Sequence, residues 1–366
     1  MVKRLVLVLV LVCISLFCCS LGARGGEILR FVYCSDLHYG IDREFRGAES
    51  VSADSVSRAM LRSFGLLENA VLPDDGGVGG GCVFGEPDFV VCTGDIANRM
   101  ESGVQPASES WRQFLRDWAE YLDRLYLVPG NHDISNAIGY PKPMSPERDA
   151  SSAAGIYDMM MHTDTTVSAE TFDYGTDRTH YTFVMDSVRF VFMGMWPDSC
   201  MREWYGSAVT AGDDLPVLLF THDPPGADAK HFTNPHCPYD INPADRFENL
   251  LADTCSVGSI DSLPLGNWRA LERFIAGHPE IKAYFHGDCN YNEFYTWHGV
   301  DSTVALPVIR VDSPMKGEFS AQDETLLSYV VVVLDTSTGR LTARECLWNT
   351  DGGASLVWGS SVTLLY

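Results

Sequence analysis

The sequence has few basic residues. Lysine and arginine together number 26 against 49 aspartate and glutamate residues, so the formal net charge is −23 at pH 7. A protein that grips nucleic acid by its phosphates needs basic patches, and this deficit therefore argues against nucleic-acid binding by a basic surface. It also means that a phosphate-bearing substrate requires a local source of positive charge, for which a bound metal ion is the obvious candidate.

Several catalytic and cofactor motifs are missing. The chain contains no G-x-G-x-x-G dinucleotide fingerprint, even in its Gly-rich segment 73–85, and no G-x-x-x-x-G-K-[ST] phosphate loop. The G-x-S-x-G elbow of α/β-hydrolases and the H-E-x-x-H zinc helix are also absent. No C-x-x-C occurs, so neither a zinc knuckle nor a thioredoxin-type site is supported.

The first 25 residues have the pattern of a secretory signal peptide. Lys3-Arg4 precedes an uninterrupted apolar run over residues 5–21, and small residues follow at 22–23 as a cleavage site. We therefore expect a secreted or periplasmic protein. An uncleaved membrane anchor is the alternative, although a run of 17 residues is at the short edge for a membrane span.

Eight cysteines remain after the signal segment, an even number that permits disulfides in an exported protein. Cys237 and Cys255 flank one polar loop and form the best candidate pair. Cys34 and Cys92 lie inside apolar strands, so we expect them to be buried thiols.

Apolar runs alternate with helical periodicity along the rest of the chain, which predicts βαβ units. The absence of internal repeats and of a clear linker favours one domain over residues 26–349, with residues 350–366 as a C-terminal tail. Strands are predicted at 28–34, 88–93, 125–128, 217–220 and 281–285, hairpins at 179–195 and 328–348, and helices at 52–72, 109–122 and 268–276.

Polar side chains follow four of these predicted strands: Asp36-Leu37-His38, Gly94-Asp95, Gly130-Asn131-His132-Asp133 and Thr221-His222-Asp223. Functional groups gather at the carboxyl ends of parallel strands, so four strands can bring these side chains to one point. Oxygen and imidazole donors suit Mn, Fe or Zn, and two such ions can stabilise an in-line displacement at phosphorus. Alone, Gly-Asp is usually a turn and Asn-His-Asp suits a helix cap. Their common position directly after apolar strands favours a metal centre.

The ordered series D-x-H, G-D, G-N-H-D and H resembles the calcineurin-like metallophosphoesterase superfamily, which includes purple acid phosphatases and many phosphodiesterases. The resemblance extends over about residues 28–349. It implies a four-layer α/β/β/α sandwich with two mixed sheets around two divalent metal ions.

The resemblance also implies roles for individual residues. Asp36 and His38 would bind the first ion, Asp95 would bridge both ions, and Asn131 and His222 would bind the second.

The same resemblance places His132 at the substrate phosphate rather than on an ion. His132 would protonate the leaving group, and Asp133 would orient the His132 ring.

The last motif departs from the family's G-H-x-H. The strand 281–285 is followed by His286-Gly287-Asp288-Cys289-Asn290, so that Asp288 stands for the first histidine and Asn290 for the second. By the resemblance, Asp288 would bind the second ion and Asn290 the first, with His286 as a substitute ligand. The exchange adds a negative charge and removes imidazole, which favours harder ions such as Mn, Mg or Ca.

We therefore expect an exported phosphoesterase that hydrolyses a phosphate mono- or diester by attack of a metal-bridging hydroxide, with His132 assisting departure of the alkoxide. The alternatives are a non-catalytic metal- or phosphate-binding member with a degenerate site, and a structural, membrane-anchored protein. Residues 136–215 and 223–264 would line the pocket, but they contain no motif that identifies the substrate. No required protein partner is evident.

Overall fold

The computed structural model describes residues 28–98, 105, 107–136, 150–161, 166–173, 176–209, 214–227 and 264–366. The predicted signal segment 1–25 and the predicted pair Cys237–Cys255 lie outside these residues. Within the described part of the chain, no helix combines the length and the apolar character that crossing a bilayer requires.

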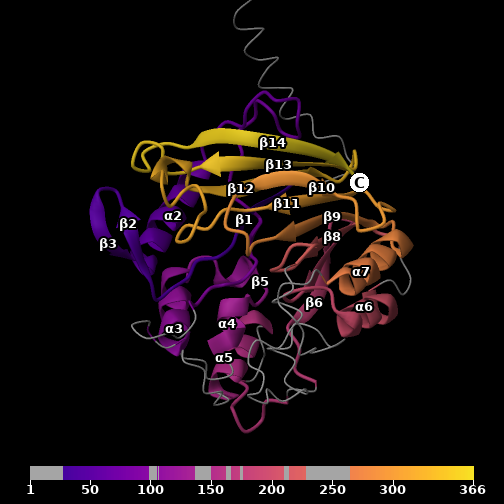
Figure 1. The fold of residues 1–366 in the computed structure, drawn as a ribbon. Coiled ribbons are helices and arrows are strands. Elements are labelled where there is room, and N and C mark those ends of the chain that lie inside the picture. Colours follow the sequence, from indigo (N-terminus) through magenta and orange to yellow (C-terminus); the bar gives the residue numbers. More distant parts are fainter. Residues whose placement is uncertain are drawn as a thin grey trace, which may run out of the picture.

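Six strands form the first mixed sheet, in the order β14-β13-β12-β1-β4-β5 (Figure 1). β1, β4 and β5 run parallel to one another, whereas β12, β13 and β14 pair antiparallel on the other side of β1. In chain order these strands are β1 (Ile28–Cys34), β4 (Phe89–Cys92), β5 (Leu125–Leu127), β12 (Ser328–Asp335), β13 (Arg340–Leu347) and β14 (Val357–Leu365).

The second mixed sheet has the order β10-β11-β9-β8-β7-β6. β7, β8, β9 and β11 are parallel, and β6 and β10 are antiparallel edge strands. The strands are β6 (His180–Met185), β7 (Val188–Met193), β8 (Val217–Phe220), β9 (Ile281–His286), β10 (Glu293–Trp297) and β11 (Leu306–Arg310). A small ribbon of β2 (Asp42–Phe45) and β3 (Ala48–Ser52) completes the strands.

The two sheets face each other across an aromatic core. Phe31 of β1 contacts Phe190 of β7 and Phe220 of β8, with ring centroids 6.2 and 6.1 Å apart. Successive side chains of a strand point to opposite faces, so Val32 of β1 faces the helices on the outer side of the first sheet instead. Both faces of β1 are thus buried, which explains why its sequence is largely apolar.

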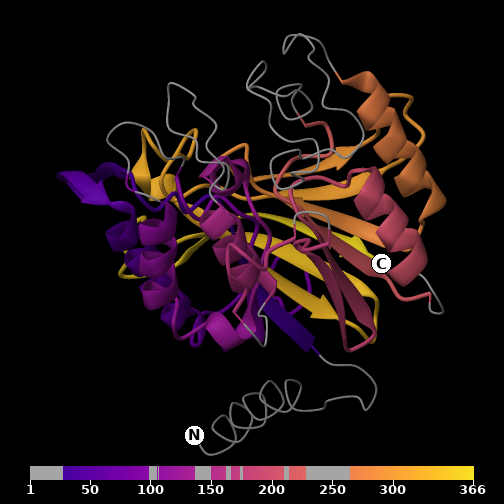
Figure 2. The same ribbon diagram turned by 90° about the horizontal axis from the view of Figure 1, so that it is seen from below.

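Helices cover the outer face of each sheet, as Figure 2 shows with the indigo to magenta helices on one side and α6 and α7 on the other. The four-layer α/β/β/α arrangement that the resemblance implies is therefore confirmed. The helices are α2 (Ala53–Leu67), α3 (Ala107–Asp117), α4 (Asn131–Asn136), α5 (Ala150–Met161), α6 (Ser199–Trp204) and α7 (Leu265–Gly277), with short helical turns η1 (Leu122–Arg124), η2 (Tyr205–Val209) and η4 (Glu324–Leu326).

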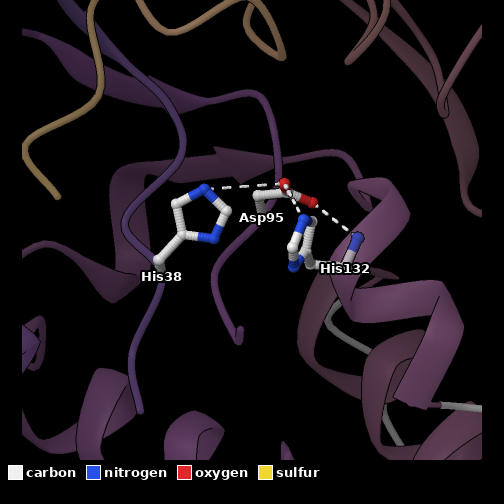
Figure 3. Close-up of side chains that lie close together, drawn as sticks. All are labelled: His38, Asp95 and His132. Atoms are coloured by element: carbon white, nitrogen blue, oxygen red, sulfur yellow. Dashed lines mark hydrogen bonds and ion pairs between the residues drawn. The ribbon is translucent and has the colours of Figure 1, made fainter. Parts of the chain in front are cut away.

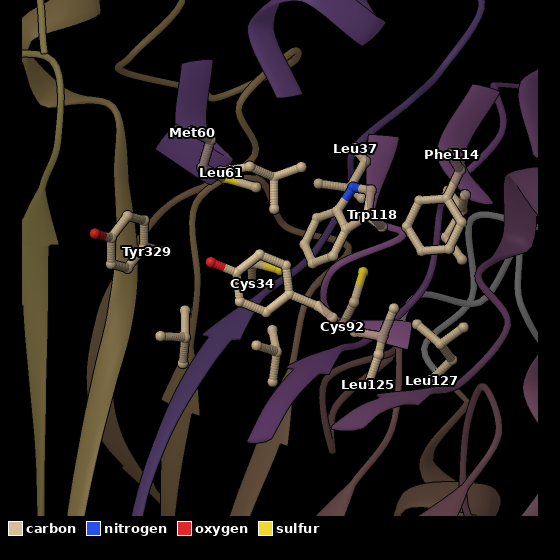
Figure 4. Close-up of a cluster of buried hydrophobic side chains, with 14 of the residues drawn as sticks. Cys34, Leu37, Met60, Leu61, Cys92, Phe114, Trp118, Leu125, Leu127 and Tyr329 are labelled. Carbon is tan, nitrogen blue, oxygen red and sulfur yellow. The ribbon is translucent and has the colours of Figure 1, made fainter. Parts of the chain in front are cut away.

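Cys34 and Cys92 belong to the layer between the first sheet and its helices (Figure 4). Met60 of α2 and the rings of Phe114 and Trp118 pack in the same cluster. The expectation that both cysteines are buried thiols is confirmed. None of the six cysteines among the described residues forms a disulfide with another of the six.

The C-terminal residues differ from the prediction. Residues 350–366 were expected to form a tail outside the domain, but Val357–Leu365 pairs with β13 as the edge strand β14. The alternating exposed and half-buried pattern of β14 is typical of an edge strand and gives a weak signal in the sequence. β10 escaped prediction for the same reason, because its side chains are exposed or half-buried.

Candidate active site

The predicted site residues meet where the carboxyl ends of strands from both sheets come together. In the first sheet, the loops after β1 and β4 are joined by backbone hydrogen bonds from Asp36 N to Gly94 O and from His38 N to Asp95 O, at 2.9 and 2.8 Å. In the second sheet, Gly287 N donates to the carbonyl of His222. The backbone N–H of Asp288 crosses between the sheets to the Asp36 carboxylate, at 3.1 Å.

Asp95 lies at the centre of this site. Its Oδ2 is 3.7 Å from His38 Nε2 and 3.9 Å from His132 Nε2, and Figure 3 shows both rings next to the carboxylate. Its Oδ1 lies 3.5 Å from His222 Nε2 and accepts a hydrogen bond from the backbone N–H of His132, at 2.8 Å. The two oxygens of one carboxylate therefore face two different sets of side chains.

His222 is held in a defined orientation. Its Nδ1 is 2.6 Å from the carbonyl oxygen of Thr93, and a carbonyl can only accept, so Nδ1 carries the proton. In the neutral ring the lone pair is then on Nε2, the atom that points into the site. Nε2 is 3.3 Å from Asn131 Oδ1 and 3.8 Å from Asp288 Oδ1.

Within the described residues, the donor atoms form three overlapping groups in which all ligand atoms lie within 4.8 Å of one another. Asp95 belongs to two of these groups and His222 to two. The groups are His38, Asp95 and His132; Asp36, Asp95 and His222; and His222, Asp223 and Asp288.

Two buried oxygens that have no hydrogen-bond donor among the described residues indicate that this arrangement fits divalent cations. Asp36 Oδ1 and Asn290 Oδ1 are buried and accept no hydrogen bond from any of the residues that the structure describes. A buried carboxylate or amide oxygen without a donor is costly, and coordination of a cation removes that cost. Together with the imidazoles of His38 and His222, these oxygens are a donor set that suits divalent metal ions.

The departure from G-H-x-H places Asp288 in the site, whereas the amide nitrogen of Asn290 makes a local hydrogen bond. Asn290 Nδ2 donates to the carbonyl of Asp288, at 2.8 Å. His286 does not belong to any of the three groups. Its Nδ1 lies 2.8 Å from the carbonyl of Gly287 and its Nε2 lies 3.0 Å from the Tyr295 hydroxyl. In this arrangement the His286 ring contacts Tyr295 of β10 and lies outside the three donor groups.

Asp133 also differs from its expected role. Its carboxylate does not contact the His132 ring but accepts hydrogen bonds from the backbone N–H groups of Ile96, Ala97 and Gly130, at 3.1, 2.8 and 3.0 Å. Asp133 therefore joins the loop that carries Asp95 to the start of α4. The sequence did not show this, because the motif contains no information about the backbone geometry of a loop far away in the chain.

The backbone of the site is strained. Asp36, Asp95 and Asp288 have φ values of 58°, 50° and 59°, a region that residues other than glycine rarely occupy. Such conformations persist only where the surroundings enforce them, and they are common at functional sites. Here the backbone bonds between the loops supply that constraint.

Burial dominates the electrostatics of the cluster. Desolvation raises the pKa of Asp95 to about 8 and the pKa of Asp36 to about 6. Burial alone would lower the pKa of His222, but the carboxylates of Asp95, Asp36 and Asp288 outweigh it and raise this pKa to about 10. Without a cation the cluster therefore retains protons, and bound cations would replace them.

Two residues near the site, Asp223 and Lys316, were not predicted as functional. Asp223 directly follows His222, and this position was its only signal. Lys316 Nζ donates to Asn98 Oδ1 at 2.7 Å and lies 3.5 Å from His132 Nε2. Lys316 follows β11, a strand that the sequence did not predict.

Comparisons with known proteins identify the family and support the fold. A family model described as calcineurin-like phosphoesterase matches residues 29–254. A dimetal phosphatase from Danio rerio has a similar structure, with a TM-score of 0.51, 12% identity, and coverage of 92% of this chain and 99% of that chain. A purple acid phosphatase from yellow lupin (Lupinus luteus) seeds also has a TM-score of 0.51 and 12% identity, with coverage of 93% of this chain and 54% of that chain. No curated protein matches the sequence.

Proposed function

The chain belongs to the calcineurin-like phosphoesterase family, and from this premise we propose that it hydrolyses a phosphate mono- or diester with two divalent metal ions. The observation that supports two ions is the position of Asp95. Its Oδ2 faces His38 and its Oδ1 faces His222, so one carboxylate can serve two neighbouring cations. The ions would acidify the attacking water and neutralise charge on the phosphate.

The residues that would hold the ions divide between the two sides of Asp95. On one side lies His38, on the other lie Asn131, His222 and Asp288. The buried oxygens Asp36 Oδ1 and Asn290 Oδ1 would supply further ligands. Mn, Fe or Zn suits the imidazole and oxygen donors, and the carboxylate of Asp288 also permits Mg or Ca.

His132 is the proposed acid for the leaving group. Its backbone is fixed at the start of α4 by the bond to Asp95 Oδ1, and its ring is partly exposed, whereas the rings of His38 and His222 are buried. A partly exposed ring next to the site can reach an ester oxygen. Proton transfer to the departing alkoxide typically raises the rate of such reactions by about 10²–10⁴-fold.

We also propose that the protein is exported. Residues 1–25 have the charge and hydropathy pattern of a signal peptide, which supports a secreted or periplasmic location.

The experiment that tests the proposal measures metal and activity in one sample. The purified chain is analysed by elemental mass spectrometry and assayed with added Mn on an aryl phosphate monoester and diester. We expect about two ions per chain and hydrolysis that Asp95→Asn abolishes. Asp123→Asn is the matched control. Asp123 is exposed on η1, away from the site, and its substitution removes the same charge as Asp95→Asn. Activity that survives in Asp95→Asn would contradict the proposed role of this carboxylate.

One observation favours a second candidate function, a metal- or phosphate-binding protein without catalysis. Asp288 and Asn290 replace two imidazoles of the family motif, and the Asn290 amide nitrogen donates to the carbonyl of the nearby Asp288. The double variant Asp288→His with Asn290→His separates the two functions. Turnover that appears only in this variant would establish the binding protein, whereas turnover in the natural chain would exclude it.

A further inference from the structure

A loop that carries one lysine, Lys316, reaches the candidate site from the end of β11. Lys316 is one of only five lysines in a chain of formal charge −23. Its ammonium group is 2.7 Å from Asn98 Oδ1 and 3.5 Å from His132 Nε2. Asn98 itself follows Asp95 in the loop after β4, and its N–H donates to the carbonyl of Tyr39. A rare positive charge thus lies beside the residue that is proposed to act on the leaving group.

The loop is attached to both sides of the site. Ser313 Oγ donates to the carbonyl of Asp36 and accepts the backbone N–H of Lys316, at 2.8 and 2.9 Å. The N–H of Glu318 donates to the carbonyl of Asn290, at 2.7 Å. Lys316 is therefore flanked by two anchors on residues that are predicted to bind the ions.

A second set of contacts holds the same loop from the opposite direction. The guanidinium of Arg43 donates to the carbonyls of Pro314 and Ser320, both at 2.6 Å. Gly317 leaves no room for a side chain, because a Cβ there would lie 2.5 Å from Asp312 Oδ1. A loop built in this way presents the Lys316 side chain in one position, which is what recognition of a small anion requires.

The charges around the Lys316 ammonium group favour a role in binding phosphate. Asp36, Asp95 and Asp288 make the cluster acidic, and a phosphate adds further negative charge when it approaches. An ammonium group is a compact charge with three donor hydrogens, and lysine is a common phosphate ligand. It attracts a phosphate with two charges more strongly than one with a single charge.

We propose that Lys316 binds the phosphate group of the substrate beside His132 and thereby makes the site selective for monoesters, whose phosphate carries two charges, over diesters. This inference rests on the proposed function of the same site and names its substrate class.

The test compares three variants of the full chain with added Mn. Lys316→Met removes the charge and keeps much of the side-chain volume, and Lys316→Arg keeps the charge. Lys282→Met is the matched control, because Lys282 lies on β9 near its amino end and bonds the carbonyl of Pro279 at 2.7 Å. Hydrolysis of 4-nitrophenyl phosphate and of bis(4-nitrophenyl) phosphate is measured at about pH 7.5, above the second pKa of a phosphate monoester at about 6. Binding of inorganic phosphate is measured by isothermal titration calorimetry.

We expect Lys316→Met to lower kcat/KM for the monoester by about 10- to 100-fold and for the diester by less than about threefold. Phosphate binding should weaken by about tenfold, Lys316→Arg should recover most of both losses, and Lys282→Met should change neither. Equal losses on the two esters, or unchanged phosphate binding, would overturn the proposal. So would a rise in bound metal in Lys316→Met, because the ammonium group would then occupy the place of a cation.

The same measurements separate this inference from the proposed function. If the natural chain hydrolyses neither ester but binds phosphate more tightly than Lys316→Met, the phosphoesterase proposal fails and the Lys316 anion site stands. If the natural chain hydrolyses both esters and Lys316→Met behaves as the control, only the Lys316 proposal fails.

Discussion

Gly130 offers the sharpest test of how the site is assembled. A Cβ at this position would lie 2.1 Å from Asp95 Oδ1 and 2.2 Å from Asp95 N. Ordinary contact begins near 3.4 Å, so Gly130→Ala must move Asp95 and the start of α4 apart by about 1.3 Å. A displacement of about 1 Å in a catalytic constellation can cost about 100-fold in rate, and overpacking costs about 1–3 kcal/mol in stability.

The assay for Gly130→Ala combines kcat/KM on an aryl phosphate, bound metal by elemental mass spectrometry, and urea unfolding. Gly65→Ala in α2 is the matched control, because no neighbouring heavy atom lies within 4 Å of a Cβ there. In a helix interior, alanine should stabilise the chain by about 0.5–1 kcal/mol without changing activity. Natural activity and metal content in Gly130→Ala would refute the reasoning, since Asp95 would then tolerate a displacement that should disrupt the site.

Three further predictions concern stability, each measured by urea unfolding. Because burial raises the pKa of Asp95 to about 8, the folded metal-free chain keeps a proton that the unfolded chain releases above about pH 4. The free energy of unfolding of the metal-free chain should therefore fall as the pH rises from about 4 to about 8. This fall should be smaller with added Mn and in Asp95→Asn. A chelator-treated protein whose free energy of unfolding rises from about pH 5 to about pH 8 would contradict this prediction. Asp75→Ala should cost about 3–5 kcal/mol, because Asp75 pairs through both oxygens with the buried Arg344, whose charge would be left unpaired; a loss below about 1 kcal/mol would show that water reaches Arg344. Glu272→Ala should cost about 2–4 kcal/mol, because its carboxylate accepts the N–H groups of Val300 and Thr303, at 2.7 and 2.8 Å. An unchanged urea midpoint would indicate that the loop between β10 and β11 does not depend on Glu272.

The strands of the sheet centres were predictable from the sequence. β1, β4, β8 and β9 are buried on both faces, so each appears as a largely apolar run that is followed by polar residues. The candidate ligands follow directly after these runs, and their order carried the resemblance to the family. Those two properties are local in the chain, which is why the fold class and the location of the site could be predicted.

The edges of the sheets could not be predicted in the same way. β14 and β10 have one partner strand each and alternate exposed with half-buried side chains, so their sequences resemble loops. Whether such a segment becomes a strand depends on the partner to which it hydrogen bonds. For β14 that partner is the preceding strand, β13. Neither strand is an apolar run, so the sequence gives no signal for their pairing.

The arrangement within the site depended on the tertiary structure alone. The sequence placed Asp133 beside His132, yet in the fold its carboxylate holds the backbone of Ile96 and Ala97. Lys316 is 184 residues from His132 in the chain, and no motif connects them. Sequence alone thus determined which residues stand at the ends of buried strands, because burial and period are local properties. Which of these side chains meet, and which charge lies beside them, was decided only when two sheets packed face to face and brought distant loops into contact.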